Sequence, residues 1–127
     1  MILPDGNLLI ARVWSAHVFH DVAQRFFQTS GRIATCPITE LNLVRVLMQL
    51  GTSKSDAFRL LEDTVRLHRG TLVPADLGVL EIKDDVAGHR NTTDAYLAHL
   101  AKKHGLTVAT MDKAFAHRFP KLVNMVK

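Results

Sequence analysis

The chain has 127 residues, of which 47% are hydrophobic, so one domain spanning residues 1–127 can bury a core without disulfides. Its 16 Lys and Arg against 12 Asp and Glu give a net charge of +4, which favours an anionic partner but does not identify one. No apolar stretch approaches the roughly 20 residues of a membrane span and no secretion signal is visible, so we expect a cytoplasmic protein without a membrane anchor. The single cysteine, Cys36, fits a reducing compartment and a small core side chain.

The N-terminal residues predict a strand and then a helix. Residues 1–4 form the expected strand, which ends at Asp5, and Gly6 and Asn7 indicate a turn. Between residues 18 and 27 apolar side chains recur with a period near 3.6, which predicts an amphipathic helix. Its buried stripe is expected to comprise Val18, Phe19, Val22, Ala23, Phe26 and Phe27.

A short buried strand and a long helix are expected next. Residues 32–36 lie between Gly31 and Pro37 and include β-branched side chains, which is typical of a buried strand. Pro37 fits the first position of a helix, because the N–H that proline lacks would have no partner there. Glu40 then falls in the first turn of that helix. The expected buried stripe comprises Ile38, Leu41, Val44 and Met48.

The middle of the chain predicts a second amphipathic helix and an irregular stretch. The helix follows a polar loop at 52–55 and ends at 68–70. A short strand at 71–73, a brief helical turn at 76–82 and a solvated loop at 83–88 complete this part. The helical residues expected to face one way are Ala57, Leu60, Leu61, Thr64 and Val65.

The C-terminal third predicts a helix at 94–104, with Thr92 or Thr93 as its N-cap, and apolar residues around most of its circumference. A strand at 106–110 then delivers Asp112 at its carboxyl end.

A short helix at 113–119 and an edge strand at 122–126 close the chain. Strands that alternate with helices imply right-handed crossovers and a mostly parallel sheet with helices on both faces. We therefore expect an α/β fold.

Four acids are expected at one edge of this sheet. Asp5 and Asp112 follow strands, whereas Glu40 and Asp94 lie in first turns of helices, where the helix dipole favours negative charge. Close carboxylates repel one another unless a cation lies among them, and oxygen-only ligands favour Mg²⁺ or Mn²⁺. Each acid could also be an ordinary turn or cap residue, and spacing alone leaves both interpretations open.

Four segments carry these acids in order: Pro-Asp5-Gly-Asn7-Leu-Leu-Ile, Cys-Pro-Ile-Thr-Glu40, Thr93-Asp94-Ala-Tyr-Leu-Ala and Ala-Thr110-Met-Asp112-Lys-Ala-Phe. Over nearly the whole chain they resemble successive motifs of PIN-domain ribonuclease toxins, the VapC-like members of bacterial type II toxin–antitoxin pairs. Gly6 departs from the bulkier residue expected between the aspartate and the asparagine, which suggests a looser turn.

The resemblance implies a PIN-like three-layer α/β/α fold with about five strands and a Mg²⁺- or Mn²⁺-dependent endoribonuclease in the bacterial cytoplasm. It also implies a cognate antitoxin, a homodimer and an RNA substrate, with transfer RNA as a first expectation. Two polar residues, Asn7 and Thr110, would orient the carboxylates. The residues that would bind metal and carry out catalysis are Asp5, Glu40, Asp94 and Asp112.

Basic residues close to the motifs could contact RNA phosphates, although each could equally belong to an ordinary solvated surface. They are Arg12, Arg45, His89, Arg90 and Lys113.

Several other functions are alternatives to a ribonuclease. A catalytically inactive PIN-like module that only binds RNA or an antitoxin would have the same fold, but the presence of all four acids argues against it. A receiver domain needs a phosphorylatable aspartate on a middle strand, and no aspartate occurs between Asp21 and Asp56. A phosphatase or a DNA nuclease would share the same acids.

Overall fold

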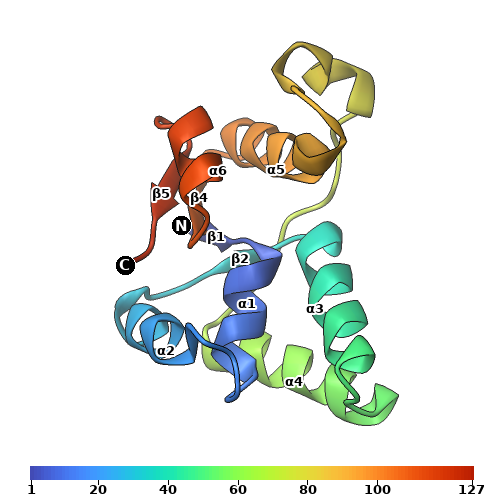
Figure 1. The fold of residues 1–127 in the computed structure, drawn as a ribbon, viewed down its shortest axis with the longest axis vertical. Helices are drawn as coiled ribbons and strands as arrows, with labels where there is room; N and C mark the ends of the chain where they lie inside the picture. Colours follow the sequence, from blue (N-terminus) through green and yellow to red (C-terminus); the bar gives the residue numbers. More distant parts are fainter.

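The computed structural model describes residues 1–127 and shows an α/β fold (Figure 1). The strands are β1 (Ile2–Pro4), β2 (Ala34–Thr35), β3 (Thr71–Leu72), β4 (Thr107–Thr110) and β5 (Val123–Met125). The helices are α1 (Gly6–Val13), α2 (His20–Thr29), α3 (Pro37–Gln49), α4 (Lys54–Leu67), α5 (Thr92–Lys103) and α6 (Lys113–Arg118). Two 3₁₀ helices, η1 (Val79–Asp85) and η2 (His89–Asn91), lie between β3 and α5. No helix is both long and apolar enough to cross a membrane.

All strand pairs are parallel, as predicted. A three-stranded sheet has the order β1-β4-β5, and β2 pairs with β3 in a two-stranded sheet. A single parallel bridge between Ile2 and Ile33 joins the two sheets. The strands therefore follow the order β3-β2-β1-β4-β5, and β5 is an edge strand.

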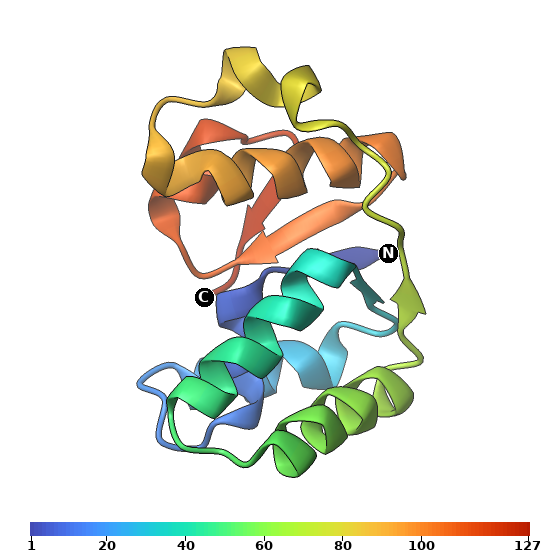
Figure 2. The same cartoon turned by 90° about the vertical axis from the view of Figure 1, so that its right-hand side faces the viewer.

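The sheet separates two hydrophobic cores. Successive residues of a strand face opposite sides, so Val108 belongs to the core under α5 and α6 and Ala109 to the core under α1, α2 and α3. Figure 2 shows α5 on one side of the sheet and α1 to α4 on the other. This is the expected three-layer arrangement, and Cys36 is fully buried in it, as predicted.

The predicted turn at Gly6 and Asn7 is wrong, because both residues belong to α1. The side chain of Asp5 caps this helix by accepting a hydrogen bond from the Leu8 N–H at 2.9 Å. A Cβ on Gly6 would lie 1.9 Å from Nδ2 of Asn42 on α3. Glycine is thus explained here by the close approach of two helices and not by the freedom of a turn.

Two predicted apolar stripes are partly wrong. Val18 is 83% exposed and, like Phe19, precedes α2. On α3, Leu41 is 70% exposed and Met48 is also exposed. The buried face of α3 comprises Thr39, Leu43, Val44 and Leu47. That set has a helical period as well, and only the packing of α3 on α1 and α4 selects between the two faces.

The stretch before α5 also differs from the prediction. Helix α5 begins at Thr92, so neither Thr92 nor Thr93 is its N-cap, and Asn91 occupies that position without a side-chain hydrogen bond. Part of the predicted loop at 83–88 is 3₁₀ helix. Four hydrogen bonds tie this stretch to α5 and its C-cap His104: His99 to Asp85 (2.6 Å), Lys103 Nζ to the Asp76 carbonyl (2.5 Å), His104 to Asp76 (2.7 Å) and Tyr96 Oη to the Leu77 carbonyl (2.8 Å).

Candidate carboxylate site

Parallel pairing places the carboxyl ends of β1 and β4 side by side. Pro4 pairs with Ala109, and the N–H of Asp5 donates to the Ala109 carbonyl at 2.9 Å. Asp5 therefore lies next to Thr110, although 105 positions separate the two residues in the sequence.

Asp5 is a buried carboxylate held by two hydrogen bonds. Its side chain is 5% exposed, and besides the Leu8 N–H it accepts a bond from Thr110 Oγ1 at 2.5 Å. Burial raises the pKa of Asp5 from 3.8 to about 6; the two hydrogen bonds oppose this rise, and the Asp94 and Asp112 carboxylates add to it. The negative charges of Asp94 and Asp112 thus contribute to the raised pKa of Asp5.

Asp94 and Asp112 complete a group of three interacting carboxylates. Asp94 is half-buried in the first turn of α5, and its pKa is raised by burial and by Asp112, while the nearby Arg118 opposes the rise. Asp112 is exposed and caps α6 with one oxygen, Oδ1, which accepts from the N–H groups of Ala114 (2.9 Å) and Phe115 (3.2 Å). The second oxygen of Asp112 has no bond within the chain.

Thr110 connects two of these acids. Its hydroxyl donates to Asp5 and accepts a bond from the Asp112 N–H at 3.0 Å. Thr110 therefore contacts the first of the predicted acids directly, and its role in orienting a metal-binding carboxylate stays a prediction.

Glu40 stands apart from the three aspartates. It lies in the first turn of α3, as predicted, and its Oε2 accepts a hydrogen bond from Thr35 Oγ1 at 2.7 Å. It is not among the charges that shift the pKa of Asp5 or Asp94. Three of the four predicted acids are thus near enough to influence one another's pKa, whereas the fourth, Glu40 on α3, is hydrogen-bonded to Thr35 of β2.

A cavity of about 430 Å³ opens at the N-terminal ends of α1, α3 and α5, and we call it the carboxylate pocket. These helix ends carry partial positive charge that favours anionic side chains. The polar residues that line it include Asp5, Asn7, Asn42, Arg45, Thr93 and Asp94. Asn7 is thus near Asp5, as expected, but no hydrogen bond joins the two side chains.

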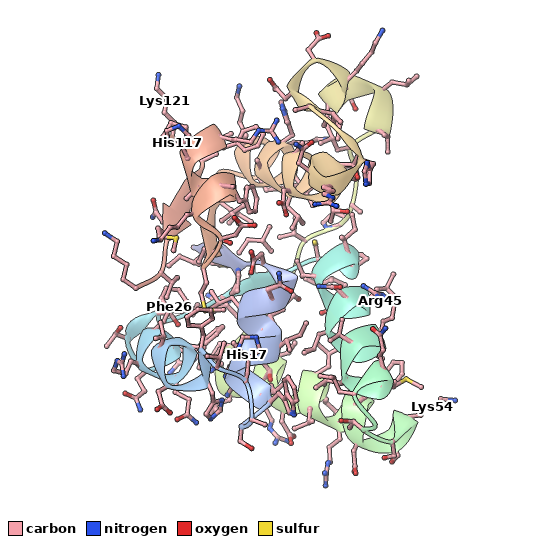
Figure 3. The ribbon with its side chains drawn as sticks, in the orientation of Figure 1. His17, Phe26, Arg45, Lys54, His117 and Lys121 are labelled. Carbon is pink, nitrogen blue, oxygen red and sulfur yellow. The ribbon has the colours of Figure 1, made fainter.

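The predicted RNA-contacting residues fall at different places. Arg45, on α3 (Figure 3), lines the carboxylate pocket and donates to Asn42 Oδ1 at 2.7 Å. Lys113 follows Asp112 and is exposed, as are His89 and Arg90 in η2. Arg12 lies in the last turn of α1, at the end of that helix remote from Asp5.

Two residues that contact the predicted acids or lie close to them were not predicted from the sequence. Arg118 is a cation close to Asp94. Asp112 caps α6 and Arg118 lies in the last turn of that helix, and this placement could have suggested that Arg118 lies near the acids. Thr35 binds Glu40, and its place at the end of β2, five residues before Glu40, could have suggested the contact.

The donor chemistry of the carboxylate pocket suits a hard divalent cation. Asp5 and Asp94 provide oxygen donors, and Mg²⁺ is commonly held by one or two carboxylates with water and substrate oxygens as further ligands. A cation would also stabilise the ionised form of both residues, whose pKa is raised mainly by burial and further by repulsion between the carboxylates. No group of three or more His, Cys, Asp or Glu side chains is gathered closely enough to hold a metal ion as it stands.

Comparison with known proteins gives consistent matches. The family model described as "PIN domain" matches residues 2–119. Ribonuclease VapC29 of Mycobacterium tuberculosis is 39% identical over 118 residues, which cover 91% of this chain and 89% of that protein. Ribonuclease VapC39 of the same species is 38% identical over 125 residues, with 90% of each chain covered.

Solved structures share the fold. FitAB bound to the IR36 DNA fragment matches with a TM-score of 0.72 and 20% identity, covering 98% of this chain and 94% of that one. VapBC2 from Rickettsia felis, bound to a DNA fragment from its promoter, matches with a TM-score of 0.69 and 14% identity, and both chains are fully covered (100%).

Proposed function

Because this chain belongs to the PIN-domain family, we propose that it is a divalent-metal-dependent endoribonuclease and the toxin of a toxin–antitoxin pair. The observation that carries the proposal is the buried carboxylate of Asp5, which lines the same pocket as Asp94 and interacts with Asp112. RNA as substrate is supported by the relatives, which are named as ribonucleases, and by the net positive charge of the chain.

In this proposal Asp5, Asp94 and Asp112 hold Mg²⁺ or Mn²⁺. Such a metal, when bound, lowers the pKa of a coordinated water and polarises the scissile phosphate. The chain fixes the first of these carboxylates through Thr110 and the Leu8 N–H. Asp112 is fixed through Oδ1, which leaves its other oxygen free.

Glu40 is the fourth acid of the proposed site. Thr35 holds its Oε2, so Oε1 remains to bind the metal or to accept a proton from the attacking water. Arg45 and Lys113 are the basic residues best placed to contact RNA phosphates near the acids, because Arg45 lines the carboxylate pocket and Lys113 adjoins Asp112.

We also propose a cognate antitoxin and a homodimer, because the chain belongs to the PIN-domain family. An apolar cavity of about 650 Å³ adjoins the carboxylate pocket, with which it shares Ile38 and Thr93. Leu80, which is 88% exposed, lines this cavity. A protein partner that covered it would remove apolar surface from water beside the acids.

The proposal is tested by titrating Mn²⁺ into the wild-type protein and into Asp5→Asn and Asp94→Asn, with circular dichroism to confirm folding. We expect heat of binding in the wild type and its loss in both variants. Asp56→Asn is the matched control, since Asp56 is an exposed residue of α4 that pairs with Arg59.

The same proteins are then incubated with total RNA, with Mn²⁺ or with EDTA. Cleavage only by the wild type and by Asp56→Asn, and only with metal, is the expected result. Cleavage that persists in Asp5→Asn would contradict the assignment. Metal binding without cleavage of any RNA would favour the inactive binding module.

A further inference from the structure

A third cavity, of about 660 Å³, lies at the end of α1 remote from the carboxylate pocket, and we call it the arginine pocket. Figure 1 shows α1 running from the sheet toward α4, and its eight residues span about 12 Å. Three guanidinium groups line the pocket: Arg12 from α1, Arg32 from the segment before β2, and Arg69 from the segment after α4. The arginine pocket and the carboxylate pocket have no lining residue in common.

The arginine pocket contains cations without counter-ions. No Asp or Glu lines it, and none of its three arginines takes part in an ion pair within the chain. The other polar lining residues are Gln24, Gln28 and His68, whose side chains carry no negative charge.

Arg12 is the most confined of the three cations. It is half-buried, donates through Nε to His68 Nε2 (3.0 Å) and through Nη1 to Thr64 Oγ1 (3.1 Å), and lies over the Phe27 ring at 5.6 Å. All these partners are neutral groups. Burial and the charge of Arg12 lower the pKa of His68, so the imidazole is neutral at pH 7 and, with Nε2 accepting, carries its proton on Nδ1.

The other two arginines are exposed at the rim of the pocket. Arg32 donates to the Arg69 carbonyl at 3.4 Å and to Thr71 Oγ1 at 3.3 Å, and both bonds are long. The C-terminal ends of α1, α2 and α4 surround the pocket and offset part of its charge through their dipoles, but none of their backbone carbonyls accepts a hydrogen bond from the Arg12 guanidinium. The guanidinium groups therefore keep donors available for an external anion.

We propose that the arginine pocket is a phosphate-binding site, separate from the carboxylate pocket. A guanidinium presents a planar fork of donors that matches the oxygens of a phosphate, and a phosphate offers enough oxygens to engage more than one such fork. The phosphate can come from the backbone of a nucleic acid or from free phosphate compounds. Binding of a nucleic-acid backbone rests on the proposed ribonuclease function, and the arginine pocket would then anchor the RNA away from the cleavage site. Binding of free phosphate compounds does not depend on that function.

The test uses metal-free protein in EDTA, so that binding is measured without cleavage. Inorganic pyrophosphate is titrated calorimetrically into the wild type, into Arg32→Gln/Arg69→Gln and into the control Arg59→Gln/Arg66→Gln. The control loses the same charge from two exposed arginines of α4 that do not line the pocket. We expect the pocket variant to bind pyrophosphate about tenfold more weakly and the control to change less than about twofold.

The source is resolved with a fluorescently labelled RNA 12-mer, whose binding is followed by anisotropy. Weaker RNA binding by the pocket variant than by the control supports a backbone anchor, whereas unchanged RNA binding with weakened pyrophosphate binding supports a site for free phosphates. Equal loss of pyrophosphate affinity in both variants, or no binding by the wild type, overturns the proposal. A hexaglutamate peptide that binds the wild type more tightly than pyrophosphate would also overturn it, because the pocket would then suit an acidic protein. Asp5 does not line the arginine pocket. The metal-binding and cleavage assays with Asp5→Asn therefore test the ribonuclease proposal independently of the arginine pocket.

Discussion

Asp5 combines a proposed catalytic role with a cost in stability. The rise of its pKa from 3.8 to about 6 corresponds to about 3 kcal/mol by which folding disfavours the ionised carboxylate. Because the folded pKa lies above the unfolded value, this penalty is present in full above about pH 6 and disappears as the pH falls toward 3.8. The metal-free protein therefore loses stability through this group as the pH rises from 5 to 7.5.

Replacing Asp5 by Asn removes the charge and keeps most of the shape. We expect Asp5→Asn in EDTA to raise the free energy of unfolding at pH 7.5 by about 1–3 kcal/mol, and by clearly less at pH 5. Urea unfolding of both proteins at the two pH values measures the difference. A variant that is less stable than the wild type at pH 7.5 would mean that the hydrogen bonds from Thr110 and Leu8 outweigh the burial of charge.

The close contact between α1 and α3 depends on the absence of a side chain at Gly6. An alanine Cβ would lie 1.9 Å from Nδ2 and 2.8 Å from Cγ of Asn42, so one of the two helices or the Asn42 side chain must move. We expect Gly6→Ala to destabilise the protein by about 1–2 kcal/mol, as overpacking usually does, despite the higher helix propensity of alanine.

Asn42→Ala removes the atoms that clash most. In a double-mutant cycle measured by urea unfolding, Gly6→Ala should therefore cost at least about 1 kcal/mol less in the Asn42→Ala background than alone. Additive effects would show that Asn42 moves aside freely and that the glycine has another origin.

Sequence patterns predicted where helices and strands begin and end better than they predicted which face of a helix is buried. The strand ends at Asp5 and Asp112 and the first turn that holds Glu40 were predicted, because prolines, glycines and short apolar runs mark such boundaries. The buried face of α3 was not predicted correctly, because the predicted set of side chains and the set that is buried both recur with a helical period. The bond between Thr35 and Glu40 also escaped prediction, because it depends on how β2 is placed against α3.

At the scale of the molecule, the parallel order of the strands creates the candidate site. Asp5 and Asp112 lie near enough for Asp112 to raise the pKa of Asp5 because β1 and β4 are neighbours, and the rule that ligands bind at the carboxyl ends of parallel strands predicted that edge of the sheet. Spacing along the chain could not predict that Arg12 and Asp5 would occupy opposite ends of one short helix and line separate pockets. Such placement follows from tertiary packing, which brings the ends of α2 and α4 to Arg12.

Metal binding should couple this site to the stability of the whole fold. A ligand present at about 100 times its Kd stabilises the folded state by about 2.7 kcal/mol, so Mn²⁺ should raise the Tm of the wild type by several degrees. Protons compete with the metal for Asp5, whose pKa is about 6, so the shift in Tm should be smaller at pH 5 than at pH 7.5. In Asp5→Asn the shift should nearly vanish, while Asp56→Asn should retain it. Thermal unfolding with and without Mn²⁺ makes this comparison, and a full shift in Asp5→Asn would mean that the stabilising metal binds elsewhere on the protein.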